Sequence, residues 1–596
     1  MAPPLKDFAL IGDCRTAALV ARDASISWLC LPHFSSSAVF ASLLDDERGG
    51  SFRLRPRQPF IVTRRYLEDT AILETVFATQ SGRMRIIDFF TVLDGVRPLR
   101  PMRELVRIVE GLDGTVDLEV DVDFRPDFAR AKPRLDFRKR MGWTWCWRNR
   151  IAVLRSDIMV EQQDGRLRGG FTIGTGERQS FSLSYTEADP AILPVLGEDV
   201  RRRLDSTLAW WRAWHGRCTY HGPHRAAVLQ SARVLQLLSF ALSGAIVAAP
   251  TTSLPETIGG ARNWDYRYCW LRDAGLTAQA LVGLGYQLEA RAYLDWLLHA
   301  TRLTWPELSI MYDIYGRTDL GEQELPHLAG YRGSRPVRIG NGAYRQRQLD
   351  VYGETVMAAE TVAGTIKRID RLEARMLKGL GKTVCQQWRL PDSGIWESRA
   401  ASQHHTLSKV MCWAALDRLL RMEERGIIDI GSSWSERFAR EREEIARTIE
   451  RRGFNATLNT YTSTLEGNEV DASLLLMACV GYKPAGEARM RATYDTIGRL
   501  LGRNGLLYRR DNAERREGAF GICSFWAVDN LARRGDVDEA ERLFDHLLGY
   551  ASDLGLFGEE IDPDTGAALG NFPQAFTHIG LINAALAIQS ARRACS

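Results

Sequence analysis

The chain has 596 residues, of which 45% are hydrophobic and 26% are charged, the ordinary balance of a soluble globular protein. Its formal net charge is only +4, from 78 basic and 74 acidic residues, and no long basic run occurs, so we expect no nucleic-acid partner. A chain of this length predicts two domains, one of them large.

The first residues and the apolar segments argue against export and against a membrane span. Met1 to Asp7 lacks the apolar core of a signal peptide. The longest apolar run, 234–250, is shorter than a membrane span and is interrupted by serines and a glycine, so we interpret it as a buried helix. The ten cysteines are scattered without CxxC or Cys/His ligand spacing. We therefore expect reduced cysteines, no membrane association and a cytoplasmic location.

Residues 1–197 are predicted to form an antiparallel β-sandwich domain. Short runs of strand-forming residues follow one another closely and are bounded by turn residues, as in such sandwiches. A hairpin is predicted from 13–20 and 23–26, with Arg22 and Asp23 near its tip. The other predicted strands are 25–31, 51–54, 60–62, 71–77, 84–90, 116–122, 151–154 and 170–173.

The pattern becomes helical near residue 198. Residues 198–221 are predicted to form a helical linker with apolar anchors at Trp210, Trp211 and Trp214. Residues 222–596 are predicted to form a catalytic helical domain, because long amphipathic or apolar helical stretches recur there. These stretches are 225–245, 273–300, 353–374, 405–424, 432–452, 471–481, 486–502, 519–534, 537–550 and 574–593.

About a dozen helices fit this segment if two escape inspection. Such a set can close as paired inner and outer rings, an (α/α)6 barrel; an open helical solenoid is the alternative, although no shared repeat motif is found. The loops between the predicted helices are 251–272, 304–350, 385–404, 455–470, 505–518 and 551–573. Binding chemistry is expected on these loops, at one end of a rigid scaffold.

The segment from Gly259 to Asp273 is the most informative part of the chain. Its last twelve residues hold four aromatics, three arginines and two aspartates. Core segments avoid such charge and surface segments avoid such aromatic density. Aromatic side chains can stack on the C–H faces of a sugar ring, while arginine and carboxylate groups form hydrogen bonds with its hydroxyls. The segment therefore predicts a sugar pocket; the alternative is a buried ion-pair cluster that braces a helix start.

Glu397 is the first candidate for acid/base catalysis. It follows Trp396 between turn-forming stretches, so an aromatic wall can hold it partly desolvated. Desolvation raises the pKa of a carboxyl group and keeps it protonated, as a general acid requires. Arg399 would oppose this shift if it turned inward, and an exposed loop glutamate is the alternative interpretation.

Glu559 and Glu560 lie in a glycine-flanked loop and form the second candidate. Adjacent glutamates can meet different environments, so one can stay ionised as a base that activates water; a solvated acidic loop is the alternative. Two carboxylates from distant loops are what glycosidic bond hydrolysis needs, an acid for the leaving oxygen and a base or nucleophile opposite it. Sequence spacing does not distinguish retention from inversion.

A third polar loop, 335–350, offers further side chains that could bind a sugar, among them Gln348 and Asp350. The alternative is that these side chains only hold the turns of the loop together. Metal and nucleophile chemistry find little support. His404–His405 is the only close histidine pair, and neither HExxH, a GxSxG elbow nor a P-loop occurs. We expect no metal and no organic cofactor.

Several separate segments, in order and nearly from end to end, resemble glycoside hydrolase family 15. This is the glucoamylase-like family, and the resemblance is to its bacterial and archaeal branch, which includes trehalases. The matching segments are 11–20 with 28–32, 262–273, 394–397, 559–563 and 570–578.

The resemblance implies an amino-terminal β-sandwich and a carboxy-terminal (α/α)6 barrel. It also implies an inverting exo-hydrolysis that releases β-D-glucose from the non-reducing end of an α-glucoside, with Glu397 as general acid and Glu559 as general base. The residues that it places with the substrate are Trp270, Arg272, Asp273, Trp396, Gln348, Asp350, His405, Lys409 and Glu560.

The leading hypothesis is a glucoamylase- or trehalase-type hydrolase. The expected cytoplasmic location and the lack of an appended starch-binding module favour a small α-linked saccharide, trehalose or a short α-gluco-oligosaccharide. The linkage depends on a leaving-group subsite built from loops such as 304–350 and 455–470. An alternative hypothesis is a phosphorylase or transglycosylase on the same scaffold, although the presence of Glu559 disfavours it. A non-catalytic sugar-binding protein is disfavoured by both carboxylates, and the oligomeric state, homo-oligomer included, is left open.

Overall fold

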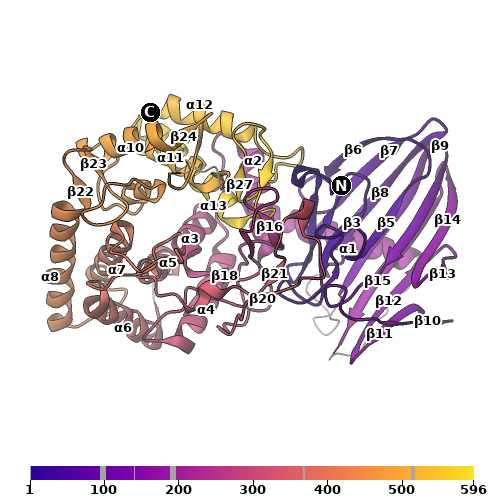
Figure 1. Cartoon of the computed structure of the whole chain (residues 1–596), viewed down its shortest axis with the longest axis horizontal. Helices are drawn as coiled ribbons and strands as arrows, with labels where there is room; N and C mark the ends of the chain where they lie inside the picture. The colour runs from indigo at the N-terminus through magenta and orange to yellow at the C-terminus, as the bar shows by residue number, and fades with distance from the viewer. Residues whose placement is uncertain are drawn as a thin grey trace.

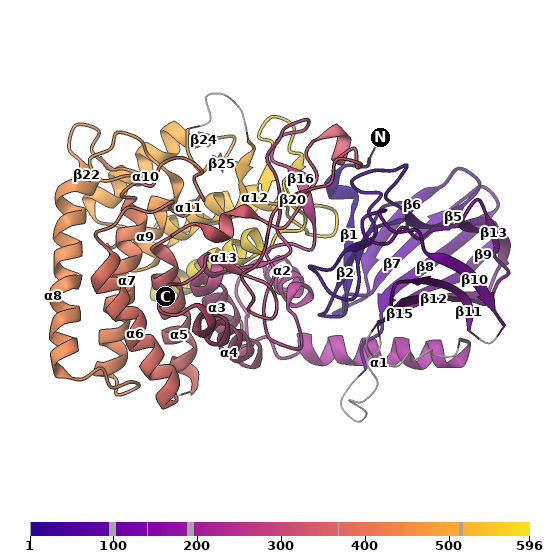
Figure 2. The same cartoon turned by 60° about the horizontal axis from the view of Figure 1, so that its bottom comes forward.

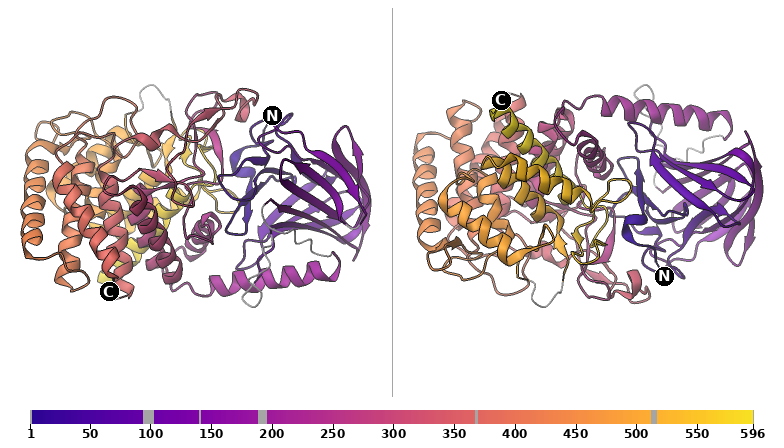
Figure 3. Two further views of the ribbon diagram at one scale, coloured as in Figure 1. Left: turned by 90° about the horizontal axis from the view of Figure 1, so that it is seen from below. Right: turned by 90° about the horizontal axis from the view of Figure 1, so that it is seen from above.

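The computed structural model describes residues 2–93, 103–139, 141–187, 196–366, 369–511 and 517–595. The large sheet and the ring of helices occupy opposite ends of an elongated molecule, and one long helix lies beside the sheet, as both views of Figure 3 show. The sandwich and the helical domain meet through buried polar contacts: the Trp28 indole donates to the carbonyl of Pro250 at 2.7 Å, and Arg267 donates to the carbonyl of Ser36 at 2.6 Å.

The amino-terminal domain is an antiparallel β-sandwich, as predicted. Its two halves share one long strand, β9 (Glu104–Asp123). The first half comprises β1 (Ala9–Gly12), β2 (Ala17–Val20), β3 (Ile26–Cys30), β4 (Ala38–Phe40), β5 (Ser51–Pro56), β13 (Glu161–Gln163) and β14 (Arg166–Gly174). The second comprises β6 (Ile61–Tyr66), β7 (Leu73–Ala78), β8 (Gly82–Phe90), β10 (Arg134–Arg138), β11 (Gly142–Trp147), β12 (Arg150–Ser156) and β15 (Arg178–Thr186).

Strand β9 joins the halves because its two ends pair with different neighbours. Residues near its start pair with β8 and β15, whereas residues near its end pair with β5 and β14. Side chains from the two halves meet in the core, where the rings of Phe52 in β5 and Phe181 in β15 lie 5.9 Å apart. The predicted hairpin is present as β2 paired with β3.

Helix α1 (Glu198–His215) runs alongside the sandwich towards the helical domain (Figure 2). Val200 and Leu204 pack on a cluster formed by Ile72, which precedes β7, and by residues of β8 and β9. At its other end, the Trp214 ring stacks on Tyr286, with centroids 4.5 Å apart. The helix therefore contacts both domains through its apolar side chains.

The helical domain consists of two rings of helices (Figure 1). The inner helices are α3 (Ala274–Gly283), α5 (Asp350–Ile366), α7 (Thr406–Glu424), α9 (Leu476–Cys479), α11 (Gly521–Arg533) and α13 (Ala575–Cys595). Each packs on the next, and α13 returns to α3. The outer helices are α2 (Arg225–Leu238), α4 (Gln287–Thr304), α6 (Arg371–Gln387), α8 (Ser432–Thr448), α10 (Ala488–Leu501) and α12 (Val537–Leu548).

This closed ring confirms the predicted (α/α)6 barrel and excludes the open solenoid. The sequence explains which helices lie inside. Helix α11 is buried on nearly every side, as an apolar segment requires, whereas α12 buries only Ala540, Phe544 and Leu547 and exposes its charged face.

Several predicted helix boundaries were wrong at glycines and at polar breaks. The predicted helix 225–245 ends at Leu238, because Ser239 is extended and Gly244 turns the chain at a φ of +83°. The predicted helix 273–300 is two helices that separate at Gly285, where φ is +88°. The predicted helix 353–374 is also two helices; its residues 367–368, like 512–516 of the predicted loop 505–518, lie outside the described residues.

No helix among the described residues is both long and apolar enough to cross a lipid bilayer.

Candidate active site

The candidate site lies in loops that precede the inner helices. Arg272 and Asp273 come directly before α3, Glu397 lies in the loop before α7, and Glu559 lies in the loop before α13. Because inner and outer helices alternate in direction, the amino-terminal ends of the inner helices meet at one end of the barrel. The positive ends of their dipoles favour ionised carboxylates there.

Glu397 is held by two donors on one oxygen. The Trp270 indole donates to its Oε1 at 2.6 Å, and Arg272 donates to the same atom at 2.9 Å. Burial raises the pKa of Glu397, while Arg272 and the Trp270 hydrogen bond lower it. The backbone of Glu397 has a φ of +56°, a left-handed conformation that a residue with a side chain adopts only at a cost. The protein thus maintains a strained loop to place this carboxyl group.

Arg399 does not turn towards Glu397. Its guanidinium group binds Glu322 at 3.0 Å and lies over the Trp264 ring, 4.2 Å from the centroid. The cation that opposes the pKa shift of Glu397 is Arg272, from the motif that precedes α3.

Glu559 is only 1% exposed and is not among the residues that line the cavity that Glu397 borders. Its Oε2 accepts a hydrogen bond from the backbone of Asn571 at 3.3 Å, and its Oε1 has no hydrogen-bond partner among the described residues. A Cβ atom at Gly570 would lie 2.4 Å from Oε2, so only glycine leaves room for the carboxylate. Burial, and then the charge of Glu256, raise the pKa of Glu559 to about 8, while a hydrogen bond from Tyr266 lowers it.

Tyr266 interacts electrostatically with both candidate carboxyl groups. Burial, then Glu559 and then Glu397 raise the pKa of the Tyr266 hydroxyl well above its usual value. Tyr266, Glu397 and Arg272 all line one cavity of about 260 Å³. The Tyr266 phenol therefore connects Glu559 electrostatically with the cavity that Glu397 borders.

The rest of that cavity is aromatic and strongly charged. Its aromatic walls include Trp264, Trp396 and Phe520, and its arginines include Arg262, Arg399, Arg509 and Arg510. Asn341 and Ala343, from the loop 304–350, also contribute. None of the described residues in the loop 455–470 is among the lining residues.

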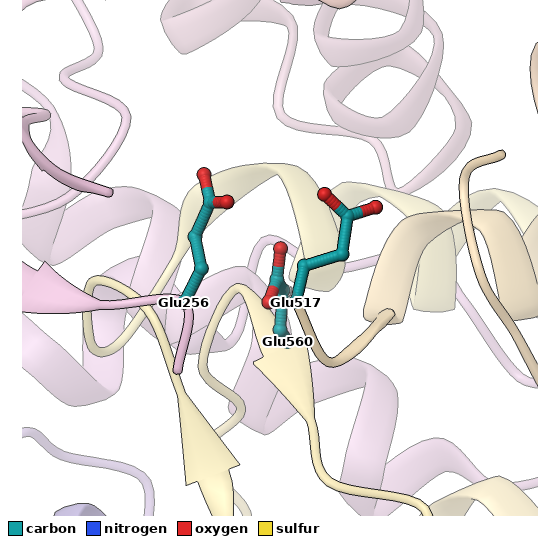
Figure 4. Close-up of side chains that lie close together, drawn as sticks. All are labelled: Glu256, Glu517 and Glu560. Atoms are coloured by element: carbon teal, nitrogen blue, oxygen red, sulfur yellow. The ribbon is translucent and has the colours of Figure 1, made fainter. Parts of the chain in front are cut away.

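Glu560 lies with Glu256 and Glu517 in a buried carboxylate cluster (Figure 4), in which their oxygens lie within 4.8 Å of one another. Arg509 binds both Glu256, at 3.2 Å, and Glu517, at 2.6 Å. Arg262 binds Glu517 at 2.7 Å. The arginines thus supply the positive charge that a cation would otherwise bring, which gives no support for a metal site in this cluster.

Three predicted substrate-binding residues lie beside the catalytic candidates. Trp396 borders the cavity and donates its indole N–H to Asp471 at 2.9 Å. Asp273 is buried and accepts a hydrogen bond from Arg272 at 2.9 Å, so it orients that guanidinium group. Trp270 is buried and faces Glu397.

Three other predicted substrate-binding residues, Gln348, Asp350 and Lys409, are buried and are not among the residues that line the cavity. Gln348 and Asp350 are both 1% exposed, and their side-chain polar atoms have no hydrogen-bond partner among the described residues. Burial and then the charge of Asp392 raise the pKa of Asp350 to about 7. Lys409 donates to the carbonyl of Leu390 at 2.7 Å, at the start of the loop that carries Glu397.

His405 and Glu560 complete the predicted set, and neither borders the cavity. A Cβ atom at Gly394 would lie 2.7 Å from the His405 ring, so His405 packs against the Glu397 loop. Glu560 is fully buried and accepts a hydrogen bond from the backbone of Gly518 at 2.7 Å. Direct contacts from these residues to substrate stay predictions.

Sequence reasoning missed Tyr266, Glu256 and Arg509 as site residues. Tyr266 stands inside the 259–273 segment, and its place between charged neighbours was a usable signal. Glu256 and Arg509 gave no local signal, because they meet only through a contact between residues that are 253 positions apart.

The chain combines a β-sandwich, an (α/α)6 barrel and a cavity lined by aromatic and charged side chains, and its relatives identify this combination as that of a glycoside hydrolase. The family pattern of glycosyl hydrolases family 15 matches residues 222–540 and 535–586, and that of the trehalase-like amino-terminal domain matches residues 1–154. The chain belongs to glycosyl hydrolases family 15 and is a glycoside hydrolase.

Relatives match along nearly the whole chain. A trehalase from Mycolicibacterium smegmatis is 35% identical, over 98% of this chain and 91% of its own length. A trehalase from Thermoplasma volcanium is 32% identical, over 99% of this chain and 94% of its own. The crystal structure of a bacterial glucoamylase complexed with acarbose has the same fold, with a TM-score of 0.74, 13% identity, and coverage of 100% of this chain and 97% of that one.

Proposed function

We propose that the protein is an inverting exo-acting α-glucosidase that releases β-D-glucose from the non-reducing end of a small α-glucoside. Glu397 acts as general acid and Glu559 as general base. The observation that carries the proposal is the position of Tyr266, which lines the cavity with Glu397 and interacts electrostatically with both carboxyl groups. Two carboxyl groups that face one sugar are the arrangement that glycoside hydrolysis requires.

Glu397 is suited to protonate the leaving oxygen. Both donors contact Oε1, so Oε2 is the atom that can carry the transferable proton. The raised pKa favours the protonated state before reaction, and Arg272 stabilises the carboxylate that remains after transfer.

Glu559 is suited to take a proton from water on the opposite face of the sugar. Its Oε1 makes no hydrogen bond to the described residues, so it can accept one from the attacking water. The backbone of Asn571 holds the other oxygen at 3.3 Å, and Gly570 packs against it, which keeps the carboxylate fixed while the water moves.

Trehalose is the substrate that we favour. The relatives from Mycolicibacterium smegmatis and Thermoplasma volcanium bear the name trehalase and match this chain almost from end to end. The cavity, at about 260 Å³, is slightly smaller than the usual range for ligand pockets and suits a short saccharide.

The test is a panel of α-linked disaccharides, with proton NMR of the first glucose released. From trehalose we expect equal amounts of the two anomers at early times, before mutarotation, because the attacked sugar is inverted to β-glucose and the leaving sugar keeps its α configuration. Release of the α-anomer alone would contradict the role of Glu559 as a base. Turnover that depends on phosphate and yields glucose 1-phosphate would establish a phosphorylase instead, and sugar binding without turnover would establish a binding protein.

The pH dependence tests the coupling between Glu256 and Glu559. In an acid/base pair, the optimum of kcat/KM lies midway between the two macroscopic pKa values. Burial raises both pKa values, so we expect the optimum well above the ordinary glutamate pKa of about 4.3.

Replacing Glu256 with glutamine removes a negative charge that raises the pKa of Glu559. The pKa of Glu559 then falls, and the optimum is expected to move to lower pH. The measurement is the kcat/KM profile of the wild type and of Glu256→Gln. An optimum that stayed in place or moved to higher pH would show that Glu256 does not act on the base.

A further inference from the structure

One wall of the cavity consists of a tryptophan covered by an arginine. Trp264 and Arg399 both line the cavity, and the Arg399 guanidinium carbon lies 4.2 Å from the centre of the Trp264 ring. Arg399 is also bound to Glu322 at 3.0 Å. Its side chain is 54% exposed, so it lies where the cavity meets solvent.

Glu322 holds this wall in place from the loop 304–350. Its Oε2 accepts a hydrogen bond from the backbone of Gly342 at 3.0 Å in addition to that from Arg399. Its Oε1 lies 3.3 Å from Arg338, whose guanidinium carbon lies 4.7 Å from the centre of the Trp264 ring. One carboxylate therefore binds two arginines that both pack on the same indole, which fixes their positions.

The wall is also tied to the catalytic carboxylates. The carbonyl of Trp264 accepts a hydrogen bond from the Asn571 side chain at 3.0 Å, and the backbone of Asn571 binds Glu559 at 3.3 Å. On the other side, Arg399 follows Glu397 by two residues in the same loop. The hydrogen bonds through Asn571 on one side and the two-residue spacing between Glu397 and Arg399 on the other therefore fix the position of the wall relative to the catalytic carboxyl groups.

The direction of the leaving group follows from the proposed acid. Glu397 protonates the leaving oxygen, so the leaving sugar lies on the Glu397 side of the cavity, where Ser398 and Arg399 are the next lining residues. A single leaving sugar ends against Trp264 and Arg399. A longer saccharide would have to occupy the space of this wall. Its binding would therefore break the Arg399–Glu322 ion pair and move Arg399 away from the Trp264 indole.

Resting on the proposed function, we propose that the wall formed by Trp264, Arg399 and Glu322 limits the substrate to two sugar units. Trp264 and Arg399 are then specificity-determining residues, and Glu322 is a positioning residue that acts through Arg399. The inference also assigns a role to the loop 304–350, which supplies the carboxylate that fixes the wall. It concerns chain length and applies to any α-linkage that the enzyme cleaves.

The experiment compares kcat/KM within pairs of substrates that share the cleaved linkage and differ in length: trehalose with 4-O-α-glucosyltrehalose, and maltose with maltotriose and maltotetraose. We expect the wild type to prefer the disaccharide strongly. In Arg399→Ala, the ratio of the longer substrates to the disaccharide is expected to rise by about tenfold or more, because the wall no longer closes. Glu322→Gln keeps the side-chain shape but loses the charge, and it is expected to move the ratio in the same direction. Arg399→Lys is expected to restore part of the preference.

Arg389→Ala is a matched control. Arg389 is also 54% exposed, binds Glu441 at 2.9 Å and lies 4.2 Å from the centre of the Trp388 ring, but it does not line the cavity. In Arg389→Ala, the ratio of kcat/KM for the longer substrates to kcat/KM for the disaccharide is expected to equal that of the wild type. An unchanged ratio in both Arg399→Ala and Glu322→Gln, or a wild type that cleaves maltotetraose as well as a disaccharide, would overturn the inference.

A change in the chain-length ratio tests the wall and can be distinguished from a failure of the proposed function. That failure would appear as the wrong anomer, or as unimpaired turnover after loss of either carboxyl group, whatever the chain-length ratio.

Discussion

Glutamine at position 397 or at position 559 is expected to lower kcat by about 10²–10⁴-fold, because each substitution removes one proton-transfer group and little else. Glutamine keeps the shape of the side chain, and at position 397 its carbonyl can still accept the bonds from Trp270 and Arg272. Binding of glucose, the proposed product, is expected to persist. The measurements are kcat with trehalose and calorimetric titration with glucose.

Glu289→Gln is the control for Glu397→Gln. Glu289 accepts a hydrogen bond from the Trp214 indole at 3.0 Å and binds Arg217, and its side chain is 16% exposed, against 17% for Glu397. It has the same donors and the same burial on the outer helix α4, outside the cavity. The control is expected to keep wild-type kcat. Near-normal turnover in Glu397→Gln or in Glu559→Gln would overturn the role given to that residue.

Arg267→Met is expected to destabilise the protein by about 3–5 kcal/mol, the usual result of leaving one partner of a buried ion pair alone. Arg267 binds both oxygens of Asp265, at 2.8 and 2.6 Å, and both side chains are almost fully buried. Arg267 also donates to the carbonyl of Ser36 in the sandwich, and Asp265 accepts from the backbone of Gly340 at 3.0 Å. The pair therefore links the sandwich to the loop that carries Asn341.

The free energy of unfolding is to be measured by denaturant titration followed by tryptophan fluorescence and by residual activity. Removing both charges, as in Asp265→Leu with Arg267→Met, is expected to recover part of the loss. Arg22→Met breaks ion pairs of Arg22 with Asp7 and Asp553, but Arg22 is 43% exposed. It is expected to cost less than about 1 kcal/mol. If Arg267→Met and Arg22→Met lowered the free energy of unfolding by the same amount, burial of the Arg267–Asp265 pair would contribute nothing to stability.

The sequence predicted the two architectures because each has a periodicity that burial imposes. Strand residues such as 116–122 alternate between apolar and polar side chains. The apolar stretch that forms α11 is longer than a strand and fits a buried helix. Boundaries were less predictable. The stretch 273–300 contains no proline and keeps a helical pattern, so periodicity gave no reason to divide it. The backbone conformation of Gly285 divides it.

The sequence also marked the residues whose chemistry is concentrated in one segment. Trp270, Arg272 and Asp273 are adjacent, and together they bind or orient Glu397, so local density of charge and aromatics predicted a real cluster. The direction of Arg399 was not predictable from its position near Glu397. Glu322, far away in the chain, decides it by binding the guanidinium group.

By itself, the sequence determined the sandwich, the barrel and the residue types that can transfer protons to and from a sugar, because burial patterns and side-chain chemistry are local properties. Only the tertiary structure decided which charges face one another. It brought Tyr266 into one cavity with Glu397, and it bound Arg509 to Glu256 and Glu517. Electrostatic interactions depend on distance through space and on burial, and neither can be read from positions along a chain.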